Sequence, residues 1–280
     1  MRTVSAIKNI NSTLIVYGFN MVLQFIIRFV LLYYLSIEYL GLNGLFDNIL
    51  TVLSLTELGI GPAIIFSLYS PLANHDLETA KSIMRIFKKA YIYIGTLILF
   101  LGLCISPFVQ HLIKVPPNIA YLNIFFLLFV VDTGISYFYS YKKCLLIADQ
   151  KQYIANYYRG ITQLIGSLFQ IALVILTHSF WVYIILRICM TFSENFLIAR
   201  KADHLYSFLN EKNIRPLNKD IYQSIIRNIK ALILHKIGGV TVFGTSNIIL
   251  SKFVGLSAVC VIYELLFEFI NVSISCLSGI

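Results

Sequence analysis

Several ionisable side chains lie inside long apolar stretches of this sequence. Arg28 and Arg187 are two of them, and Asp47, Glu57 and Asp132 add carboxylates. A charged side chain at the centre of a bilayer costs about 2.5–3.5 kcal/mol on insertion scales, so such residues are rare and usually functional. These residues are therefore the first candidates for a functional site.

Helical spacing places the candidates on shared faces, because each residue of an α-helix turns by about 100°. Asn20, Gln24 and Arg28 recur at every fourth residue, with Tyr17 beside them. In the span at 42–69, a second such face with an arc of about 80° holds Asn43, Asp47, Ser54, Glu57 and Gly61. The charged members of the shared faces in the other stretches are Asp47, Glu57, Asp132, Arg159, Arg187, Glu194, Glu264 and Glu268. Such faces predict helices packed around a wet central cavity; the alternative is a polar bundle core without a transport role.

The elements that carry these residues are predicted to be membrane-spanning helices. The 280-residue chain is 58% hydrophobic and 12% charged, with a mean hydropathy of +0.80. Soluble domains carry about 25% charged residues, so lipid must solvate much of this chain. A helix crosses a bilayer with about 20 mostly apolar residues. The predicted fold is all-α and polytopic, with spans near 12–35, 42–69, 90–113, 119–141, 157–177, 180–199, 231–253 and 257–279.

The basic residues predict the orientation of these spans. Of the 22 Lys and Arg residues, 18 fall on one side of the predicted spans and two, Lys114 and Lys252, on the other, while Arg28 and Arg187 lie within spans. The positive-inside rule then places the N-terminus and the 200–230 linker in the cytoplasm. The same clustering explains the net charge of +9 without a nucleic-acid partner. Residues 71–90 and 218–236 are predicted to form amphipathic helices at the lipid headgroups.

No catalytic, metal or cofactor motif accompanies the predicted helices. The chain has no Walker A loop, and its Gly-Ile-Gly at 59–61 follows no predicted strand and lacks the third glycine of a dinucleotide fingerprint. Its five cysteines form no CxxC pair, and its five histidines are scattered. We predict neither enzyme activity nor a cofactor or metal. A cavity that is not accompanied by catalytic, metal-binding or cofactor-binding motifs indicates a transporter.

Gly59, Gly61 and Pro62 predict a bend in the second span. Proline lacks a backbone N–H, and the glycines let the backbone turn. The bend is interpreted either as a hinge used during transport or as a static bend that fits the bundle.

Three segments resemble one family of membrane proteins. They are YLGLNGLFDNILTVLSLTELGIGPAIIFSLYSPLA (Tyr39–Ala73), YKKCLLIADQKQYI (Tyr141–Ile154) and KIGGVTVFGTSNIILSKFVGL (Lys236–Leu256). These segments are similar to Wzx-type polysaccharide repeat-unit flippases of the multidrug/oligosaccharidyl-lipid/polysaccharide exporter superfamily. The similarity extends along essentially the whole chain and is most specific in the first segment.

The resemblance implies a MATE-like fold of two six-helix bundles that face each other as a V. The N-terminal bundle would cover 1–199, a cytoplasmic linker with an amphipathic helix would cover 200–230, and the second bundle would begin at 231–280. The second bundle would then be mostly missing, so a longer, C-terminally truncated transporter is expected.

The resemblance also implies a cargo, an undecaprenyl-pyrophosphate-linked oligosaccharide flipped across the bacterial plasma membrane for surface polysaccharide such as O-antigen. Arginine suits a pyrophosphate because its planar fork donates two parallel hydrogen bonds. Plasma-membrane lipids, a polysaccharide polymerase and glycosyltransferases are the other expected partners. The expected roles are as follows: Arg28, Arg159 and Arg187 hold the pyrophosphate; Tyr17, Asn20 and Gln24 contact sugar; Asp47, Glu57, Asp132 and Glu194 carry protons or position arginines.

Three alternatives stay open. A cation-coupled multidrug exporter of the same superfamily would prefer aromatic residues and acids, and the predicted spans contain more acids than arginines. A membrane glycosyltransferase or polymerase would need a large extracytoplasmic loop, whereas the predicted outward loops are short. The third alternative is an inactive fragment.

Overall fold

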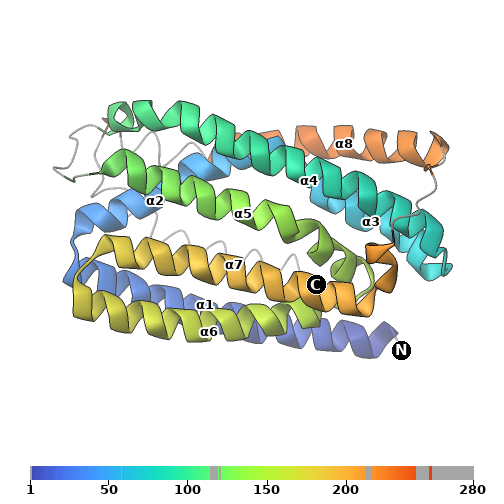
Figure 1. Ribbon diagram of the computed structural model, residues 1–280, viewed down its shortest axis with the longest axis horizontal. Coiled ribbons are helices and arrows are strands. Elements are labelled where there is room, and N and C mark those ends of the chain that lie inside the picture. Colours follow the sequence, from blue (N-terminus) through green and yellow to red (C-terminus); the bar gives the residue numbers. More distant parts are fainter. Residues whose placement is uncertain are drawn as a thin grey trace.

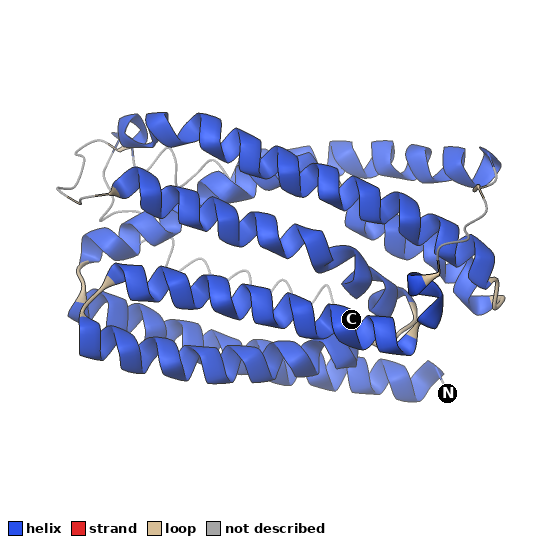
Figure 2. Cartoon of the chain, in the orientation of Figure 1, coloured by secondary structure: helices blue, strands red, loops and turns tan. Residues whose placement is uncertain are grey.

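Helices make up every regular element of the computed structural model (Figure 2), which describes residues 2–57, 59–113, 119, 121–211, 216–217, 219–243 and 252–253. The all-α prediction is confirmed for these residues. The elements, with η for a 3-10 helix, are α1 (Arg2–Tyr34), α2 (Ile37–Leu53), η1 (Ser54–Glu57), α3 (Ile60–Ala73), α4 (Leu77–Ile105), η2 (Ser106–Leu112), α5 (Leu122–Ala148), α6 (Gln152–Thr177), α7 (Phe180–Leu205), η3 (Ser207–Asn210) and α8 (Lys219–Phe243).

The helices form an elongated bundle in which they lie roughly along one axis (Figure 1). The most extensive packing joins α5 to α4 and α7, and α6 to α1 and α7. α2 and α3 lie end to end and together cross the bundle once, while α8 packs along α3. α5 is therefore the central helix, with neighbours on several sides.

Five of the described helical segments are long and apolar enough to cross a membrane: Ser5–Tyr34, Leu77–Leu112, Leu122–Ala148, Gln152–Thr177 and Phe180–Leu205. The most apolar part of each is only 17% to 44% buried inside the bundle. Phe29, Phe100 and Phe169 are examples of large apolar side chains that point outward. Water would not favour such a surface, whereas lipid would, so the described part has the character expected of a membrane protein.

Two predicted boundaries differ from the structure. Residues 71–90 are predicted to form a separate surface helix, whereas 71–73 are the end of α3 and 77–90 continue without interruption into the third span as α4. Likewise α8 runs through the predicted boundary between 230 and 231. Neither junction contains a proline or glycine that would end a helix, so an amphipathic turn simply extends into the apolar segment. The eighth predicted span, 257–279, lies outside the described residues.

Asp76 caps the N-terminus of α4. Its carboxylate accepts a hydrogen bond from the backbone N–H of Thr79 at 3.0 Å, and hydrogen bonds from Thr79 lower the pKa of Asp76 below its ordinary value of 3.8. Replacing an N-cap aspartate with alanine typically costs about 1 kcal/mol.

We expect Asp76→Ala to lower the free energy of unfolding by about 1 kcal/mol at neutral pH, measured by thermal unfolding in detergent. Because folding lowers this pKa, the stabilisation is fully present above 3.8 and is lost as the pH falls through the folded-state value. Asp76→Asn, which keeps an acceptor, should lose less. Equal stability of the alanine variant and the wild type at neutral pH would contradict the cap.

The second predicted span is broken rather than continuous. α2 ends at Leu53, the 3-10 turn η1 follows, and α3 begins at Ile60. Gly59 lies in the break with φ 74°, in the left-handed region that glycine adopts without steric cost. The two halves therefore present their side chains in different directions.

Two apolar clusters stabilise the bundle. One includes Phe46, Phe126 and Phe129, whose rings meet edge to face, and it lies where α2 packs against the first half of α5. The other includes Tyr91 and Leu145 and lies where α3, α4 and the second half of α5 meet. Polar side chains between the clusters thus have a distinct place in the bundle.

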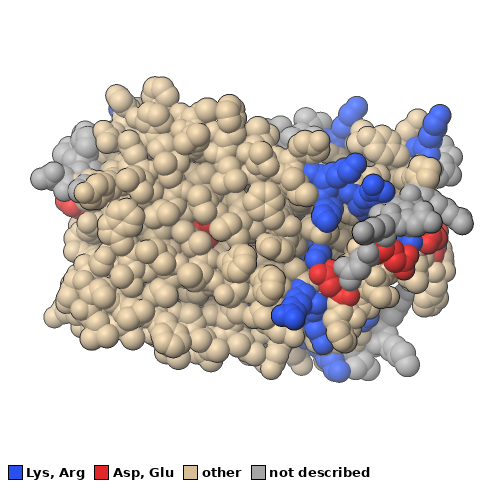
Figure 3. All heavy atoms as spheres, in the orientation of Figure 1, with Lys and Arg blue, Asp and Glu red and all other residues tan. Residues whose placement is uncertain are grey.

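Basic side chains gather at one end of the bundle on the face shown in Figure 3. This basic end contains the start of α1, α4 and α6 and the end of α3, α5 and α7. Lys142 pairs there with Asp203 at 2.5 Å, and Lys81 pairs with Glu211 at 2.6 Å. These bonds tie the end of α7 to α5, and the segment that follows α7 to α4.

Tyr206 contributes to the same attachment. Its hydroxyl donates to the Asp149 carboxylate at 2.6 Å, and burial followed by this hydrogen bond raises the pKa of Tyr206 above its ordinary value. The Lys151 ammonium lies 2.7 Å from the same carboxylate. The loop between α5 and α6 is therefore fixed to the end of α7.

α1 and α6 run parallel and in register along most of their length. Their hydrogen-bonded pairs are separated by 141 to 144 residues from one end to the other. A constant offset means that the two helices neither slip nor diverge. The pairs are Asn9 with Gln150 and Tyr153, Asn156 with Ser12 and Thr13, Arg159 with Tyr17, and His178 with Tyr34.

Candidate functional site

A polar cavity of about 250 Å³ lies where five helices converge. The side chains that line it are polar with the exception of one methionine, although the surrounding surfaces are apolar. A water molecule needs about 10–15 Å³, so the cavity has room for several waters. Its lining consists of Gln24 and Arg28 from α1, Asn43 and Asp47 from α2, Asp132 from α5, Gln163 and Gln170 from α6, and Tyr183, Arg187, Met190 and Thr191 from α7.

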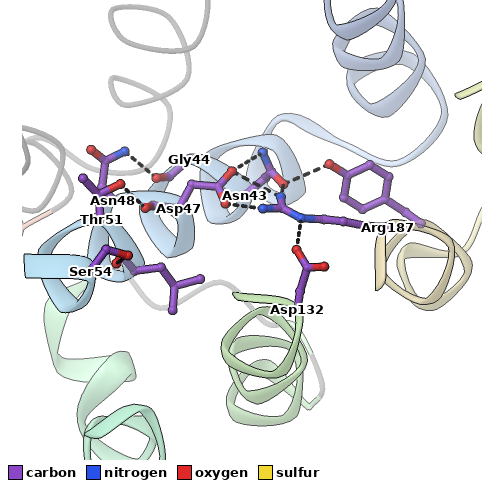
Figure 4. Close-up of polar contacts among 10 residues, drawn as sticks. Asn43, Gly44, Asp47, Asn48, Thr51, Ser54, Asp132 and Arg187 are labelled. Carbon is purple, nitrogen blue, oxygen red and sulfur yellow. Dashed lines mark hydrogen bonds and ion pairs between the residues drawn. The ribbon is translucent and has the colours of Figure 1, made fainter. Parts of the chain in front are cut away.

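Arg187 is the central residue of this site (Figure 4). Its two terminal nitrogens bind the Asp47 carboxylate, Nη2 to Oδ1 at 2.6 Å and Nη1 to Oδ2 at 3.2 Å. Its Nε donates to Oδ2 of Asp132 at 3.0 Å. One guanidinium thus bridges carboxylates on two other helices, an arrangement that no neighbouring pair on one helix could provide.

Uncharged groups complete the surroundings of Arg187. Asn43 Oδ1 accepts from Arg187 Nη1 at 3.2 Å and from the Tyr183 hydroxyl at 3.0 Å. Gln170 donates to the backbone carbonyl of Tyr183 at 2.9 Å. The guanidinium also lies over the Phe129 ring, 4.4 Å from its centroid. These contacts fix the orientation of the arginine, since its planar fork has little freedom once both edges are engaged.

The two carboxylates bound to Arg187 differ in their surroundings. Both oxygens of Asp47 accept from the arginine, and its side chain is 39% exposed. Asp132 is only 5% exposed, and its Oδ1 is buried without a hydrogen-bond partner among the described residues. A buried, unpartnered carboxylate oxygen is costly. Asp132 is therefore the less well-stabilised of the two anions.

A second polar group lies beside the first, between α1, α6 and α7. Arg159 lies over the Tyr17 ring, 5.2 Å from its centroid, and its Nε is 3.9 Å from Glu194. Asn20 is nearby on α1, with its Oδ1 buried and unpartnered among the described residues. Arg187 and Glu194 lie on the same helix but do not pair with each other. Arg187 pairs with residues of α2 and α5, and Glu194 pairs with Arg159 of α6.

Glu57 belongs to a third, separate group. Its carboxylate accepts hydrogen bonds from Tyr91 at 3.2 Å and Tyr137 at 3.3 Å. It is not among the described residues that line the Arg187 cavity. The prediction that Glu57 shares a face with Asp47 is therefore wrong, because α2 ends at Leu53 and Glu57 lies in the 3-10 turn η1 rather than further along the same α-helix.

The predicted hinge residues lie around this break. Gly59 supplies the left-handed turn before α3. A Cβ on Gly61 would lie 3.0 Å from Glu57 Oε1 and 3.1 Å from the Tyr91 hydroxyl, so this glycine leaves room for the carboxylate. Pro62 is the third residue of α3, where a backbone N–H would have no partner within the helix. Pro62 therefore starts a helix rather than bending one.

We expect Pro62→Ala to change the free energy of unfolding by less than about 0.5 kcal/mol, because no helical hydrogen bond is missing at that position. Thermal unfolding in detergent measures this change, with Pro71→Ala inside α3 as the matched control. A large destabilisation confined to the Pro62 variant would show that proline itself creates the break.

The sequence missed three tyrosines that complete these groups. Tyr183 precedes Arg187 by four residues, so a search for polar partners one helical turn away could have found it. Tyr91 and Tyr137 come from α4 and α5, so their spacing from Glu57 along the sequence gives no comparable signal. Their role depends on the packing of α3 against α4 and α5.

A larger cavity of about 530 Å³ opens at the basic end. Tyr69 and Ser70 from α3, together with Asp149 and Gln150 from the α5–α6 loop, are part of its lining. Leu72, Ala73 and Ala148 also line it, so it is a recess of mixed polar and apolar lining at the end where the basic side chains gather.

Comparisons of the chain with protein-family models, with curated proteins and with solved structures find no match.

Proposed function

We propose that this protein is a transporter that flips undecaprenyl-pyrophosphate-linked oligosaccharide across the bacterial plasma membrane. The observation that carries the proposal is a charged cavity, large enough for several waters and lined by Arg28 and Arg187, inside a bundle of apolar helices. Such residues are expensive in lipid and are typical of substrate pathways. The resemblance to Wzx-type flippases supplies the cargo.

The arginines are the proposed ligands of the pyrophosphate. Arg28 and Arg187 line the same cavity, and Arg159 lies closer to the basic end on α6. Gln24, with Tyr17 and Asn20 on the same helix, would contact sugar hydroxyls. Asp47 and Asp132 hold Arg187 in place until the anion arrives.

The proposed transport cycle requires movement. A cavity of about 250 Å³ is smaller than the roughly 300–1,000 Å³ of common ligand sites, so an oligosaccharide would enter only after the helices separate. In the proposed orientation the basic end and the N-terminus face the cytoplasm. The cavity of about 530 Å³ at that end would serve as the entrance. A polymerase and glycosyltransferases would act before and after the flip.

Deletion of the gene in its own host tests the proposal. We expect the surface polysaccharide to disappear and lipid-linked repeat units to accumulate on the cytoplasmic leaflet. Return of the wild-type gene should reverse both effects, and Arg28→Ala should not. Normal polysaccharide in the deletion strain would overturn the proposed function, whereas normal polysaccharide with Arg28→Ala would remove only the pyrophosphate role of that residue.

Multidrug export is the second candidate, because the carboxylates of Asp47 and Asp132 in the cavity would attract a cationic drug. This alternative predicts that the deletion strain accumulates ethidium and keeps its polysaccharide. The flippase proposal predicts the reverse pattern.

A further inference from the structure

The outward face of α4 changes from basic to apolar along its length. Arg85, Lys88 and Lys89 are exposed and lie three and four residues apart, so they share one face of the helix. Tyr93 follows one turn later on this face and is 75% exposed. Beyond Tyr93 the same face is exposed and apolar, at Leu97, Phe100 and Leu103. One stripe of a single helix therefore presents cations, then a tyrosine, then hydrocarbon.

The length of this stripe matches one leaflet of a bilayer. From Tyr93 to Leu103 the helix rises about 15 Å, at 1.5 Å per residue. The hydrocarbon core of a bilayer is about 30 Å thick, so this stretch has the length of the acyl chains of one leaflet. Tyrosine is enriched where the hydrocarbon meets the headgroups. Lys88 and Lys89 lie about 6–8 Å before Tyr93 along the helix axis, which places them at the level of the lipid phosphates.

The three cations of this stripe pair with no carboxylate of the described residues, in contrast to other basic residues at this end. Lys81, one turn earlier on α4, is buried and pairs with Glu78 and Glu211. Lys142 on α5 pairs with Asp203. Like charges one helical turn apart repel each other, so an anion bound from outside would stabilise the three cations.

We propose that the outward face of α4 is a binding site for an anionic phospholipid in the leaflet at the basic end, which the proposed orientation makes the cytoplasmic one. Arg85, Lys88 and Lys89 contact the headgroup phosphate, and the acyl chains lie along the apolar stripe. A zwitterionic headgroup carries its own cation, which offsets the phosphate, so a lipid with a net negative charge binds more strongly. The site does not depend on the proposed transport function.

α4 differs from the other described helices that carry exposed cations at this end. On α1, Lys8 is exposed and the exposed Ile15 follows two turns later, so this helix has one cation beside its apolar face. α8 has three exposed cations, but they are spread over about 17 Å of the helix, at Lys219, Arg227 and Lys230. Among the described helices, α4 combines three exposed cations within about one turn with an apolar stripe of leaflet length.

Quenching of tryptophan fluorescence by brominated lipids tests the site. Trp181→Phe removes the one tryptophan of the sequence, and Leu97→Trp places a reporter in the apolar stripe of α4. The protein is placed in vesicles of phosphatidylglycerol and phosphatidylcholine, with one of the two lipids brominated in each sample. We expect phosphatidylglycerol to bind beside this reporter at least about tenfold more strongly than phosphatidylcholine, since each cation near the surface contributes about fivefold. Equal binding of the two lipids would overturn the proposal.

Matched variants separate a site on α4 from the general charge of the surface. Replacing Arg85, Lys88 and Lys89 with glutamine should remove most of the preference for phosphatidylglycerol, whereas replacing the three cations of α8 should leave it unchanged. A reporter at Ile15→Trp on α1 should show a preference of no more than about fivefold.

An equal loss from the two triple variants would show a non-specific attraction to the surface and would overturn the site. Thermal unfolding in detergent establishes that the α4 triple variant is folded. Lys88→Gln alone should lower the preference by about fivefold, and this single variant keeps the test decisive if the triple variant does not fold.

Discussion

Arg187→Ala should lower the free energy of unfolding by about 3–5 kcal/mol, the usual cost of removing one partner from a buried ion pair. The substitution leaves Asp47 and Asp132 facing each other without the guanidinium that bridges them. It also removes a cation packed 4.4 Å from the centroid of the Phe129 ring. Thermal unfolding in detergent measures the loss.

Matched variants identify the cause of that loss. Arg200→Ala removes an exposed arginine from the same helix and should change stability by no more than about 0.5 kcal/mol. Arg187→Lys keeps the charge but cannot engage both carboxylates with one planar fork, so we expect an intermediate stability. Adding Asp47→Asn and Asp132→Asn to Arg187→Ala should recover part of the loss. Wild-type stability of Arg187→Ala would contradict the bridge.

Gly59→Ala should also be strongly destabilising. The residue has φ 74°, where an L side chain costs about 1–2 kcal/mol, and a Cβ there would lie 2.6 Å from Leu232 Cβ on α8. The strain and the clash act at the same point, so the break in the second span and the position of α8 must both adjust. Thermal unfolding in detergent should show a loss of stability larger than the about 1–2 kcal/mol expected from the backbone conformation alone.

Gly18→Ala is the matched control, because nothing lies within 4 Å of its added methyl group. Alanine is favoured over glycine in a helix by about 0.5–1 kcal/mol, so this variant should be neutral or more stable. In the Leu232→Gly background, which removes the Cβ atom that the new methyl group would meet, Gly59→Ala should cost less, because the clash is relieved and only the backbone strain persists. An equal cost in both backgrounds would exclude a role for the contact with α8.

The sequence predicts the helices well because apolar length is a local property. The spans that contain Arg28, Asp132, Arg159 and Arg187 all lie on described helices, and the all-α fold follows from composition and hydropathy. The inward direction of Asp47, Asp132 and Arg187 also follows, because a charge avoids lipid. The boundary errors at α4 and α8 arose where an amphipathic turn and an apolar segment share one helix.

The partners of each charge could not be predicted in the same way. Arg187 binds carboxylates on α2 and α5, and this choice depends on how three helices pack, which no spacing along one helix encodes. The separation of Glu57 from Asp47 depends on the end of α2 at Leu53 and on the 3-10 turn that follows, whereas the sequence indicated a bend only further along, at Gly59, Gly61 and Pro62. The pairing of Glu57 with Tyr91 and Tyr137 required the packed bundle.

The constant register between α1 and α6 has a mechanical consequence. Displacing one helix along the other by a single turn, about 5.4 Å, would break the hydrogen bonds from Asn9 to His178 together rather than one at a time. α1 and α6 therefore behave as one rigid unit that resists sliding of one helix along the other.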